Sequence, residues 1–507
     1  MALPTTTSAL DRGLDAGASP LSSFSSSPPF PCAPECPPAS LTATVSGLAA
    51  GTVSSSELTE RALAAVAATQ PTLNAFRVVC ESSARADAAR ADERLAAGER
   101  LALLGAPVAI KDDVDLEGHP TAFGCAGSFP GKTADSEVVR RLRAAGAVII
   151  GKTNTPEIGL YPFTEGHAFG VTRNPWHLNH TPGGSSGGGA AAVAAGIVSA
   201  AVGSDGAGSV RIPAAWTGLV GIKPQRGRIS TWPEAEAFNG LTCFGPLTRT
   251  VADTALMLDI LSGPHPGDLH TPPPPATSFR EAAGADPGRL RIALSLRHPF
   301  SGAPVALDSE IRDAIVRIAG VLADLGHEVI DADPAYGLMG MALVIRGQAG
   351  VHHWSANVPD RAMLDPRTRS SARLGRLYAG RMLRISRRLE PWLGRRVGAI
   401  FDKVDVVLTP TTATPPLRVG ATAGLGGWAT DQLMVGACPY AWPWNVLGWP
   451  GMSVPAGLTG DRLPIGAQLL GPASSEVRLL ALAAQLERVE RWHERVAPGV
   501  SATVSTR

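Results

Sequence analysis

The N-terminal part of the chain has apolar residues at helical spacing. Leu58, Leu63 and Val66 recur at nearly every turn of a helix, and Ser54–Ser56 stand before them as candidate N-caps. Residues 82–98, rich in Ala, Arg, Asp and Glu, follow the same kind of pattern. Two helices are therefore predicted before the first buried strand.

Further along, short apolar runs alternate with helical segments. The run PVAI at 107–110, which ends on Lys111, and the run AVIIGKT at 147–153 predict buried strands, with a helix over 136–145 between them. This alternation is typical of an α/β fold whose sheet is covered on both sides. Later strands are predicted at 403–411 and 451–457, and a closing helix at 475–491.

Proline-rich and polar stretches suggest how the chain is divided. Residues 1–40 are rich in Ser and Pro and bury too little apolar surface to offset chain entropy, so we expect a disordered tail. Residues 41–500 are expected to form one large domain, and 501–507 a C-terminal tail. Within the domain, 266–300 is expected to be a loop or linker leading to a second strand–helix set. Like 330–440, it is interpreted as a variable, pocket-shaping insertion.

Composition and charge narrow the classes of function. The chain has 45 basic and 44 acidic residues, which gives no reason to expect a nucleic-acid partner. No run of about 18 or more apolar residues predicts a membrane span, and no basic and apolar leader predicts export. Six cysteines in 507 residues are too few for a disulfide framework. We expect a reduced, cytoplasmic protein without a membrane or nucleic-acid partner and without a metal site.

The most informative stretch, 183–214, holds two glycine-flanked serines separated by a helix of small residues. Ser185 lies in GGSSGG at 183–188, and Ser209 lies in GAGSVR at 206–211. A serine hydroxyl needs a base before it becomes a nucleophile, and the oxyanion that its attack creates needs inward-pointing N–H groups. Glycines permit such a turn. The candidate oxyanion donors are the amides of Gly206, Ala207, Gly208 and Ser209.

Other interpretations of these residues are weaker. A flexible linker is disfavoured because an apolar helix follows at once, and a phosphate-binding P-loop would need a Lys-Ser or Lys-Thr pair that is missing. A Ser-His-Asp triad stays open, although histidines in loops are more often simply solvated, and a cysteine nucleophile lacks a glycine-rich turn. The residues available for those alternatives are His119, His167, His177, His180, Cys125 and Cys243.

The stretch 183–214 resembles the signature of the amidase signature family. Similar blocks continue over most of residues 58–490, among them APVAIKDDVD at 106–115, GKTNTPE at 151–157 and WNVLGWPGMSVP at 444–455. The resemblance implies a single α/β/α domain with a mixed, twisted sheet covered by helices. It also implies a Ser–cis-Ser–Lys triad with Ser209 as nucleophile, Ser185 as relay and Lys111 as base, and no cofactor.

Several neighbouring residues are given supporting roles. Ser186 is expected to hold the site by hydrogen bonds, and Asp205 and Arg211 to form a structural ion pair. Asp112 is expected to face away from the Lys111 amine, because neighbouring side chains in a strand point to opposite sides. One departure from the family pattern is Ala207, which stands where a glycine is usual. Its amide remains usable if the residue needs no positive φ.

The expected activity is hydrolysis of a small-molecule carboxylic amide to a carboxylate and ammonia or an amine. Amide formation by the same acyl-enzyme, and an amidase subunit of a tRNA-dependent amidotransferase, stay open as alternatives, as does a homodimer. Aromatic residues favour an apolar acyl group. The predicted pocket residues are Phe123, Gly159, Leu160, Tyr161, Trp232, Phe238 and Trp442, with Phe244 beside them.

Overall fold

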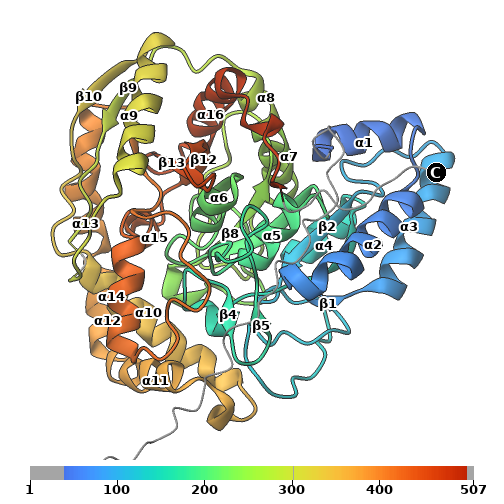
Figure 1. Ribbon diagram of the computed structural model, residues 1–507, viewed down its shortest axis with the longest axis horizontal. Helices are drawn as coiled ribbons and strands as arrows, with labels where there is room; N and C mark the ends of the chain where they lie inside the picture. Colours follow the sequence, from blue (N-terminus) through green and yellow to red (C-terminus); the bar gives the residue numbers. More distant parts are fainter. Residues whose placement is uncertain (1–38, 301, 499–507) are drawn as a thin grey trace, which may run out of the picture.

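A computed structural model describes residues 39–300 and 302–498 (Figure 1). The first helix, α1, begins at Leu41, where ordered structure was predicted to begin. Most of the predicted N-terminal tail, the whole predicted C-terminal tail, and Cys32 and Cys36 lie outside the described residues. In the described chain, no helix has the length and apolar content that crossing a lipid bilayer requires.

The core of the fold is one sheet of eleven strands in the order β1-β3-β2-β6-β8-β7-β12-β13-β11-β9-β10. Towards one end of the sheet, β2 pairs in parallel with β3 and with β6. At the other end, β9 pairs in parallel with β11 and with β10. The strands between β6 and β13 are antiparallel to their neighbours. The mixed sheet confirms the predicted fold class. The strands are β1 (Phe76–Val79), β2 (Pro107–Lys111), β3 (Val148–Thr153), β6 (Ala200–Asp205), β7 (Val220–Lys223), β8 (Cys243–Thr248), β9 (Arg291–Leu294), β10 (Glu328–Asp331), β11 (Val406–Pro410), β12 (Gly451–Leu458) and β13 (Pro464–Leu470).

One face of the sheet is covered by helices that share a single large apolar cluster with it. Val108 and Ile110 of β2 point into this cluster, together with Met452 and Val454 of β12. The helices on this side are α1 (Leu41–Ala50), α4 (Glu137–Ala144), α7 (Val251–Leu261), α8 (Phe279–Gly284), α9 (Ser309–Asp324) and α16 (Glu476–Glu490).

The opposite face carries two further apolar clusters, one at each end of the sheet. Ala109 of β2 lies in the first, so Lys111, two residues on, follows it on this side. The helices at that end are α2 (Ser55–Leu73), α3 (Glu81–Ala96), α5 (Gly187–Ala194) and α6 (Arg211–Thr217). The helices at the other end are α10 (Gly340–Trp354), α13 (Glu390–Gly398) and α15 (Pro443–Leu447).

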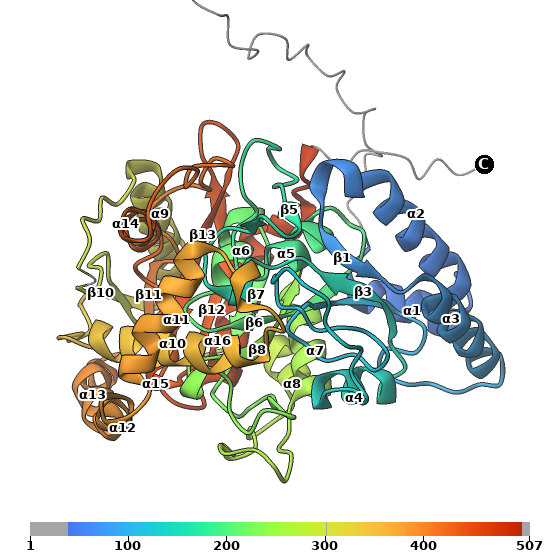
Figure 2. The ribbon, with the colours of Figure 1, turned by 90° about the horizontal axis from the view of Figure 1, so that it is seen from below.

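The remaining helices are α11 (Pro366–Tyr378), α12 (Arg381–Arg388) and α14 (Gly427–Ala437), and a small separate sheet pairs β4 (Glu165–Gly166) with β5 (Gly170–Val171). Figures 1 and 2 place α1–α3 at one end of the molecule and α9–α13 at the other.

The sequence predictions for individual elements hold with small shifts of their ends. Ser54 is the N-cap of α2, and its side chain accepts the Glu57 amide. The loop predicted within 266–300 also contains the short helix α8, which was not predicted, and the strand–helix set predicted to follow it is β9 and α9. The strand predicted at 403–411 is β11, which lies between β13 and β9.

The helix α5 consists of small residues because backbone segments of neighbouring elements pack closely against it. A Cβ on Gly188 would lie 2.4 Å from the Asn154 amide nitrogen and 2.5 Å from the Ala75 carbonyl oxygen. All of its residues are buried, from Gly187 to Ala194. The helix therefore sits close enough to β2 and β6 to fix the serine turn that precedes it.

Replacing Gly188 by Ala should lower the free energy of unfolding by about 1–3 kcal/mol, because backbone atoms rather than flexible side chains meet the new methyl group. Gly320→Ala is the matched control. It lies exposed within α9 with nothing within 4 Å of its Cβ position, and should stabilise by up to about 1 kcal/mol. Urea denaturation of both variants measures the difference, and equal effects would contradict the close packing of α5.

Candidate active site

Lys111 ends β2 and is completely buried, with its amine held between two serine hydroxyls. Its Nζ donates to Ser185 Oγ at 2.7 Å and to Ser204 Oγ at 2.7 Å. Ser185 belongs to the turn before α5, and Ser204 to the last part of β6. Three segments far apart in the sequence thus meet at one amine.

The turn that carries Ser185 has the backbone form that the family resemblance implies. The Gly184–Ser185 peptide is cis. A Cβ on Gly184 would lie 2.5 Å from the Tyr161 carbonyl oxygen, so a side chain there has no room. A Cβ on Gly159 would come within 3.2 Å of Ser185 Oγ. Gly159 therefore borders the serine.

Ser186 ties the two serine turns together. Its amide donates to the Ser209 carbonyl oxygen at 3.1 Å, and its hydroxyl donates to the Ser204 carbonyl oxygen at 3.1 Å. The same hydroxyl accepts the Ser204 amide at 3.2 Å. This agrees with the supporting position predicted for Ser186, since it fixes Ser185 and Ser209 on neighbouring turns.

The Ser209 turn is shaped by Asp205 and by the left-handed backbone of Gly208, whose φ is 120°. The Gly208 amide donates to Asp205 Oδ1 at 2.7 Å, which removes it from the set of free oxyanion donors. The backbone φ of Ala207 is not positive, so its methyl group causes no strain in the turn. Gly206, Ala207 and Ser209 remain as candidate donors.

Asp205 and Arg211 form the predicted ion pair, and both side chains are fully buried. Arg211 donates to the two Asp205 oxygens at 2.9 and 3.0 Å and to Asn445 Oδ1 at 2.7 Å. Burial would raise the pKa of the Asp205 carboxyl, but the neighbouring Arg211 guanidinium outweighs it and holds that pKa well below its usual range. The pair keeps the turn rigid from behind.

The electrostatic surroundings of Lys111 have two opposing parts. Burial lowers the pKa of the Lys111 amine, whereas Asp113, with Oδ2 at 3.6 Å from Nζ, raises it. Asp113 also accepts a hydrogen bond from the Ser204 hydroxyl. Asp112 faces away, as predicted, and pairs instead with Lys152 at 3.2 Å and Arg77 at 3.3 Å.

A cavity of about 280 Å³ borders this network. Asp113 and Thr242 both line this cavity. Thr242 also lies beside the Ser209 turn, since a Cβ placed on Gly206 would be 2.8 Å from Thr242 Oγ1. The Phe123 ring centre lies 5.6 Å from Lys111 Nζ. The aromatic side chains that line the cavity are Phe123, Phe129, Trp232, Phe238, Phe244 and Trp354.

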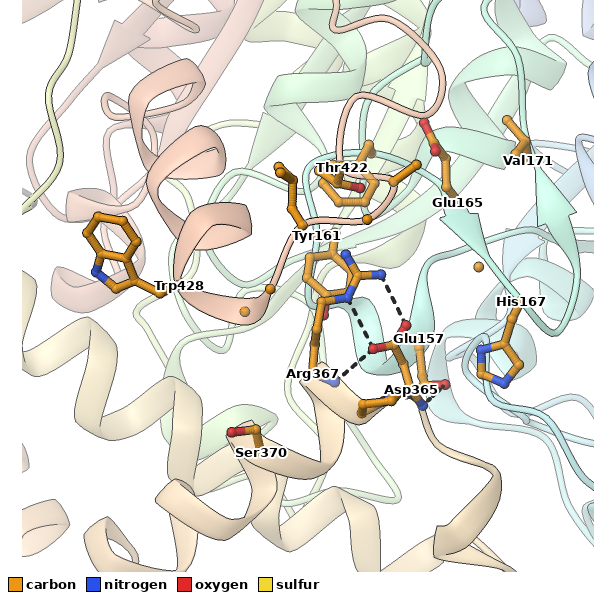
Figure 3. A pocket seen from close by; sticks show the side chains of 18 residues that line it. Glu157, Tyr161, Glu165, His167, Val171, Asp365, Arg367, Ser370, Thr422 and Trp428 are labelled. Carbon is orange, nitrogen blue, oxygen red and sulfur yellow. Dashed lines mark hydrogen bonds and ion pairs between the residues drawn. The ribbon is translucent and has the colours of Figure 1, made fainter. Parts of the chain in front are cut away.

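The other predicted pocket residues lie elsewhere. Tyr161 lines a separate cavity of about 730 Å³ between the β4–β5 hairpin, the start of α11 and the loop before α14. Its ring lies beside Arg367, which pairs with Asp365 (Figure 3). Leu160 packs into the small apolar cluster around Phe123, and Trp442 is buried in the core cluster near Ala207.

The histidine and cysteine alternatives are not supported by the geometry. His167 contacts the Met363 carbonyl at 2.9 Å, His119 lies by Cys80, and the rings of His177 and His180 pack on each other. Burial raises the pKa of the Cys125 thiol. In residues 39–300 and 302–498, no three His, Cys, Asp or Glu side chains gather in a group suited to a metal ion.

Comparison with known proteins decides the family. A family model described as Amidase matches residues 57–480. The chain belongs to the amidase family. This membership confirms the resemblance drawn from the serine turns, and it identifies the protein as an amidase, an enzyme that hydrolyses amide bonds.

Relatives and solved structures agree with this amidase assignment. The chain is 56% identical over 446 residues to a putative amidase, AmiA2, of Mycobacterium tuberculosis, covering 88% of this chain and 92% of the relative. A 6-aminohexanoate cyclic dimer hydrolase complexed with substrate matches with a TM-score of 0.84 and 31% identity, over 91% of this chain and 99% of that one. A bacterial aryl acylamidase matches with a TM-score of 0.80 and 27% identity, over 93% and 100%.

Sequence reasoning gave no role to two side chains of this site, Ser204 and Asn445, and considered a third, Asp113, only as a charge that could oppose the lowering of the Lys111 pKa. Ser204 and Asp113 both contact the Lys111 network, and Asn445 completes the cluster behind Asp205 through bonds of 2.7 and 2.9 Å. Asn445 is brought to the site only by the fold, whereas Asp113 stands two residues after Lys111.

Asp205→Asn should destabilise the amidase by about 3–5 kcal/mol, because it leaves the Arg211 charge buried without a counter-charge. Glu57→Gln removes an exposed pair with Arg61 and should change stability by less than about 1 kcal/mol. Chemical denaturation of both variants tests this. A loss below 1 kcal/mol for Asp205→Asn would show that the buried pair does not hold the turn.

Proposed function

We propose that this amidase hydrolyses a small-molecule carboxylic amide through an acyl-enzyme on Ser209. Ser185 relays the proton, and Lys111 is the base. The observation that carries the proposal is the 2.7 Å hydrogen bond between the buried Lys111 amine and Ser185 Oγ. Burial lowers the pKa of Lys111, which favours the neutral form that a base must have, although Asp113 acts in the opposite direction.

The proposed reaction moves one proton along the two serines. As Ser209 Oγ attacks the carbonyl carbon, its proton passes to Ser185, whose own proton passes to the Lys111 amine. The amides left free near Ser209, chiefly those of Gly206 and Ala207, would stabilise the oxyanion. The C–N bond then breaks, and the amine leaves with the proton returned through Ser185. Water, activated by the same relay, hydrolyses the ester at Ser209.

Asp113 and Ser204 are proposed to orient the Lys111 lone pair. A carboxylate only accepts hydrogen bonds, so the Ser204 hydroxyl must donate to Asp113 and its oxygen must accept from Lys111. In the neutral amine an N–H is still directed at Ser204, but the 2.7 Å contact with Ser185 reverses, so that the Ser185 hydroxyl donates to the lone pair of the nitrogen. Asp113 is thus a positioning residue as well as a nearby charge.

The substrate class follows from the cavity of about 280 Å³ beside the Lys111 network. Its aromatic lining favours an aryl or aliphatic acyl group over a charged one. The two solved structures named above, a cyclic-amide hydrolase and an aryl acylamidase, are compatible with such a group. A small apolar amide is therefore the proposed substrate.

Ser209→Ala, Ser185→Ala and Lys111→Ala should each lower kcat by roughly 10³-fold or more, and their combination should cost little more, because the three act as a unit. Ammonia or amine release across aryl, aliphatic, peptide and carbamate amides measures this. Aryl and aliphatic amides should react fastest.

Added hydroxylamine separates hydrolysis from acyl transfer in the same assay, since it yields a hydroxamate from any acyl-enzyme. Dominant amide formation with added amines would favour the acyltransferase alternative. Undiminished amide hydrolysis by a folded Ser209→Ala variant would overturn the proposed mechanism.

Asp113→Asn should move the acid limb of the kcat/KM profile to lower pH. The carboxylate raises the pKa of Lys111, so removing its charge lowers that pKa and leaves the base neutral further into acid. The plateau should change little because the amide oxygen still accepts from Ser204. Asp113→Ala should also lower the plateau, by roughly ten- to hundred-fold. An acid limb that stays in place in both variants would contradict this role.

A further inference from the structure

The outer side of α11, α12 and α13 has large apolar side chains that the described chain leaves substantially exposed. Their exposed fractions run from 39% at Leu374 to 73% at Leu377. Figures 1 and 2 show these helices at the end of the molecule opposite α1–α3. The apolar members of this surface are Leu374, Leu377, Met382, Ile385, Leu389 and Trp392.

The apolar residues form a stripe along the helices. Met382, Ile385, Leu389 and Trp392 are spaced by three or four residues, which places them on one side of a helix. Leu389 joins α12 to α13 in a right-handed helical conformation, so the stripe continues from one helix to the next. The buried residues of these helices, such as Leu393, occupy another side and pack on the core.

Arginines flank this stripe. Residues 361–396 contain eleven arginines and two acidic residues, Asp365 and Glu390. Both carboxylates are already paired, Asp365 with Arg367 and Glu390 with Arg226 and Arg346. Eight exposed arginines of residues 361–396 have no carboxylate within 4.0 Å in the described part of the chain. Two of them, Arg361 and Arg396, donate to backbone carbonyls, and the other six are Arg373, Arg376, Arg381, Arg384, Arg388 and Arg395. We call these six and the apolar stripe the arginine–apolar face.

The positive charge of the arginine–apolar face narrows the kinds of partner that could bind there. In a two-fold dimer the same patch meets itself, so unpaired arginines would face arginines. A nucleic acid would use the positive charge but gives aliphatic side chains no place to be buried. A bilayer with anionic lipids provides both an apolar layer and phosphates, and amphipathic helices with this pattern lie in its interface.

We propose that the arginine–apolar face binds the surface of an anionic phospholipid bilayer. The leucine, isoleucine, methionine and tryptophan side chains enter the interface, and the arginines bind lipid phosphates. The contact is peripheral, because no helix of the described residues is able to span a membrane. Binding is carried by surface residues only and does not depend on the proposed catalytic residues.

The position of the face relates it to the substrate cavity. The helix α10 packs under α11 and α12, and its other side touches the cavity. Trp354 at its end lines the cavity, and Gly350 lies against Phe238, where a Cβ would come within 2.5 Å of the ring. A bilayer bound at this face would therefore lie behind one wall of the cavity.

The test is co-sedimentation of the full chain with sucrose-loaded vesicles of phosphatidylcholine, with and without phosphatidylglycerol. We expect binding to the anionic vesicles that weakens as salt rises. Arg381→Gln, Arg384→Gln and Arg388→Gln together should reduce the partition coefficient at least ten-fold, since about 1 kcal/mol per arginine is about five-fold each. Ile385→Ser with Leu389→Ser should weaken binding to a similar degree.

A matched control changes the same number of charges at the other end of the molecule. Arg85→Gln, Arg90→Gln and Arg94→Gln on α3 should leave vesicle binding within two-fold of the unaltered chain, where two-fold is about 0.4 kcal/mol. Circular dichroism and amide hydrolysis check that every variant is folded.

Three results would overturn the proposal. One is the absence of binding to anionic vesicles. Another is a dimer in solution that the α12 variants dissociate, which would show that a second copy covers the face. The third is binding to duplex DNA that the arginine variants abolish and the apolar variants leave unchanged.

Discussion

A lysine amine held in the protein interior between two hydroxyl groups is the contact on which the rest of this structure depends. The charged form of such an amine is costly to bury, and Asp113 compensates only in part. Two other buried lysines differ from it. Lys152 pairs with Asp112 at 3.2 Å, and Lys223 donates to the Pro224 carbonyl. Within the described chain, Lys111 is the buried lysine with serine hydroxyls as its hydrogen-bond partners.

The surrounding fold serves to keep that contact in place. The strand β2 delivers Lys111 to the face covered by α5, and the glycines of α5 let the Ser185 turn come close to the sheet. Ser186 bonds both serine turns, and the Asp205–Arg211 pair supports the second turn from behind. Rigid elements on both sides thus hold the side chains of the proposed relay in position before the substrate binds. Such positioning lowers the activation barrier because the groups need not be ordered during the reaction.

Much of this was predictable from sequence because it is local. The two glycine-flanked serines, the strand ending on Lys111 and the Ser54 cap are each readable from a few residues, and the fold class followed from the alternating pattern. The Gly208 amide was wrongly counted as free, since nothing local reveals that Asp205 accepts it. Tyr161 was grouped with Phe123 by composition, but the chain turns between them and the two face different cavities. Asn445 reaches Asp205 only through the fold, which a single sequence does not display, whereas Asp113 stands two residues after Lys111 and only its direction was left open.

The expectation of no membrane partner rests on the same kind of local evidence. The absence of an apolar run excludes a predicted span, but it says nothing about apolar and basic residues that only folding places on one surface, such as Ile385 and Arg388.

The claim at the centre of this account is that the acyl group is carried by Ser209. Acid quenching during turnover of a slow amide or ester, followed by trypsin, should yield the peptide of residues 174–211 with the mass of the acyl group added. Fragmentation must distinguish Ser209 from Ser185, Ser186, Ser199 and Ser204, which share that peptide. The account predicts the added mass on Ser209, and its loss in Ser209→Ala. Acylation of Ser185, or of a residue outside 174–211, would contradict it.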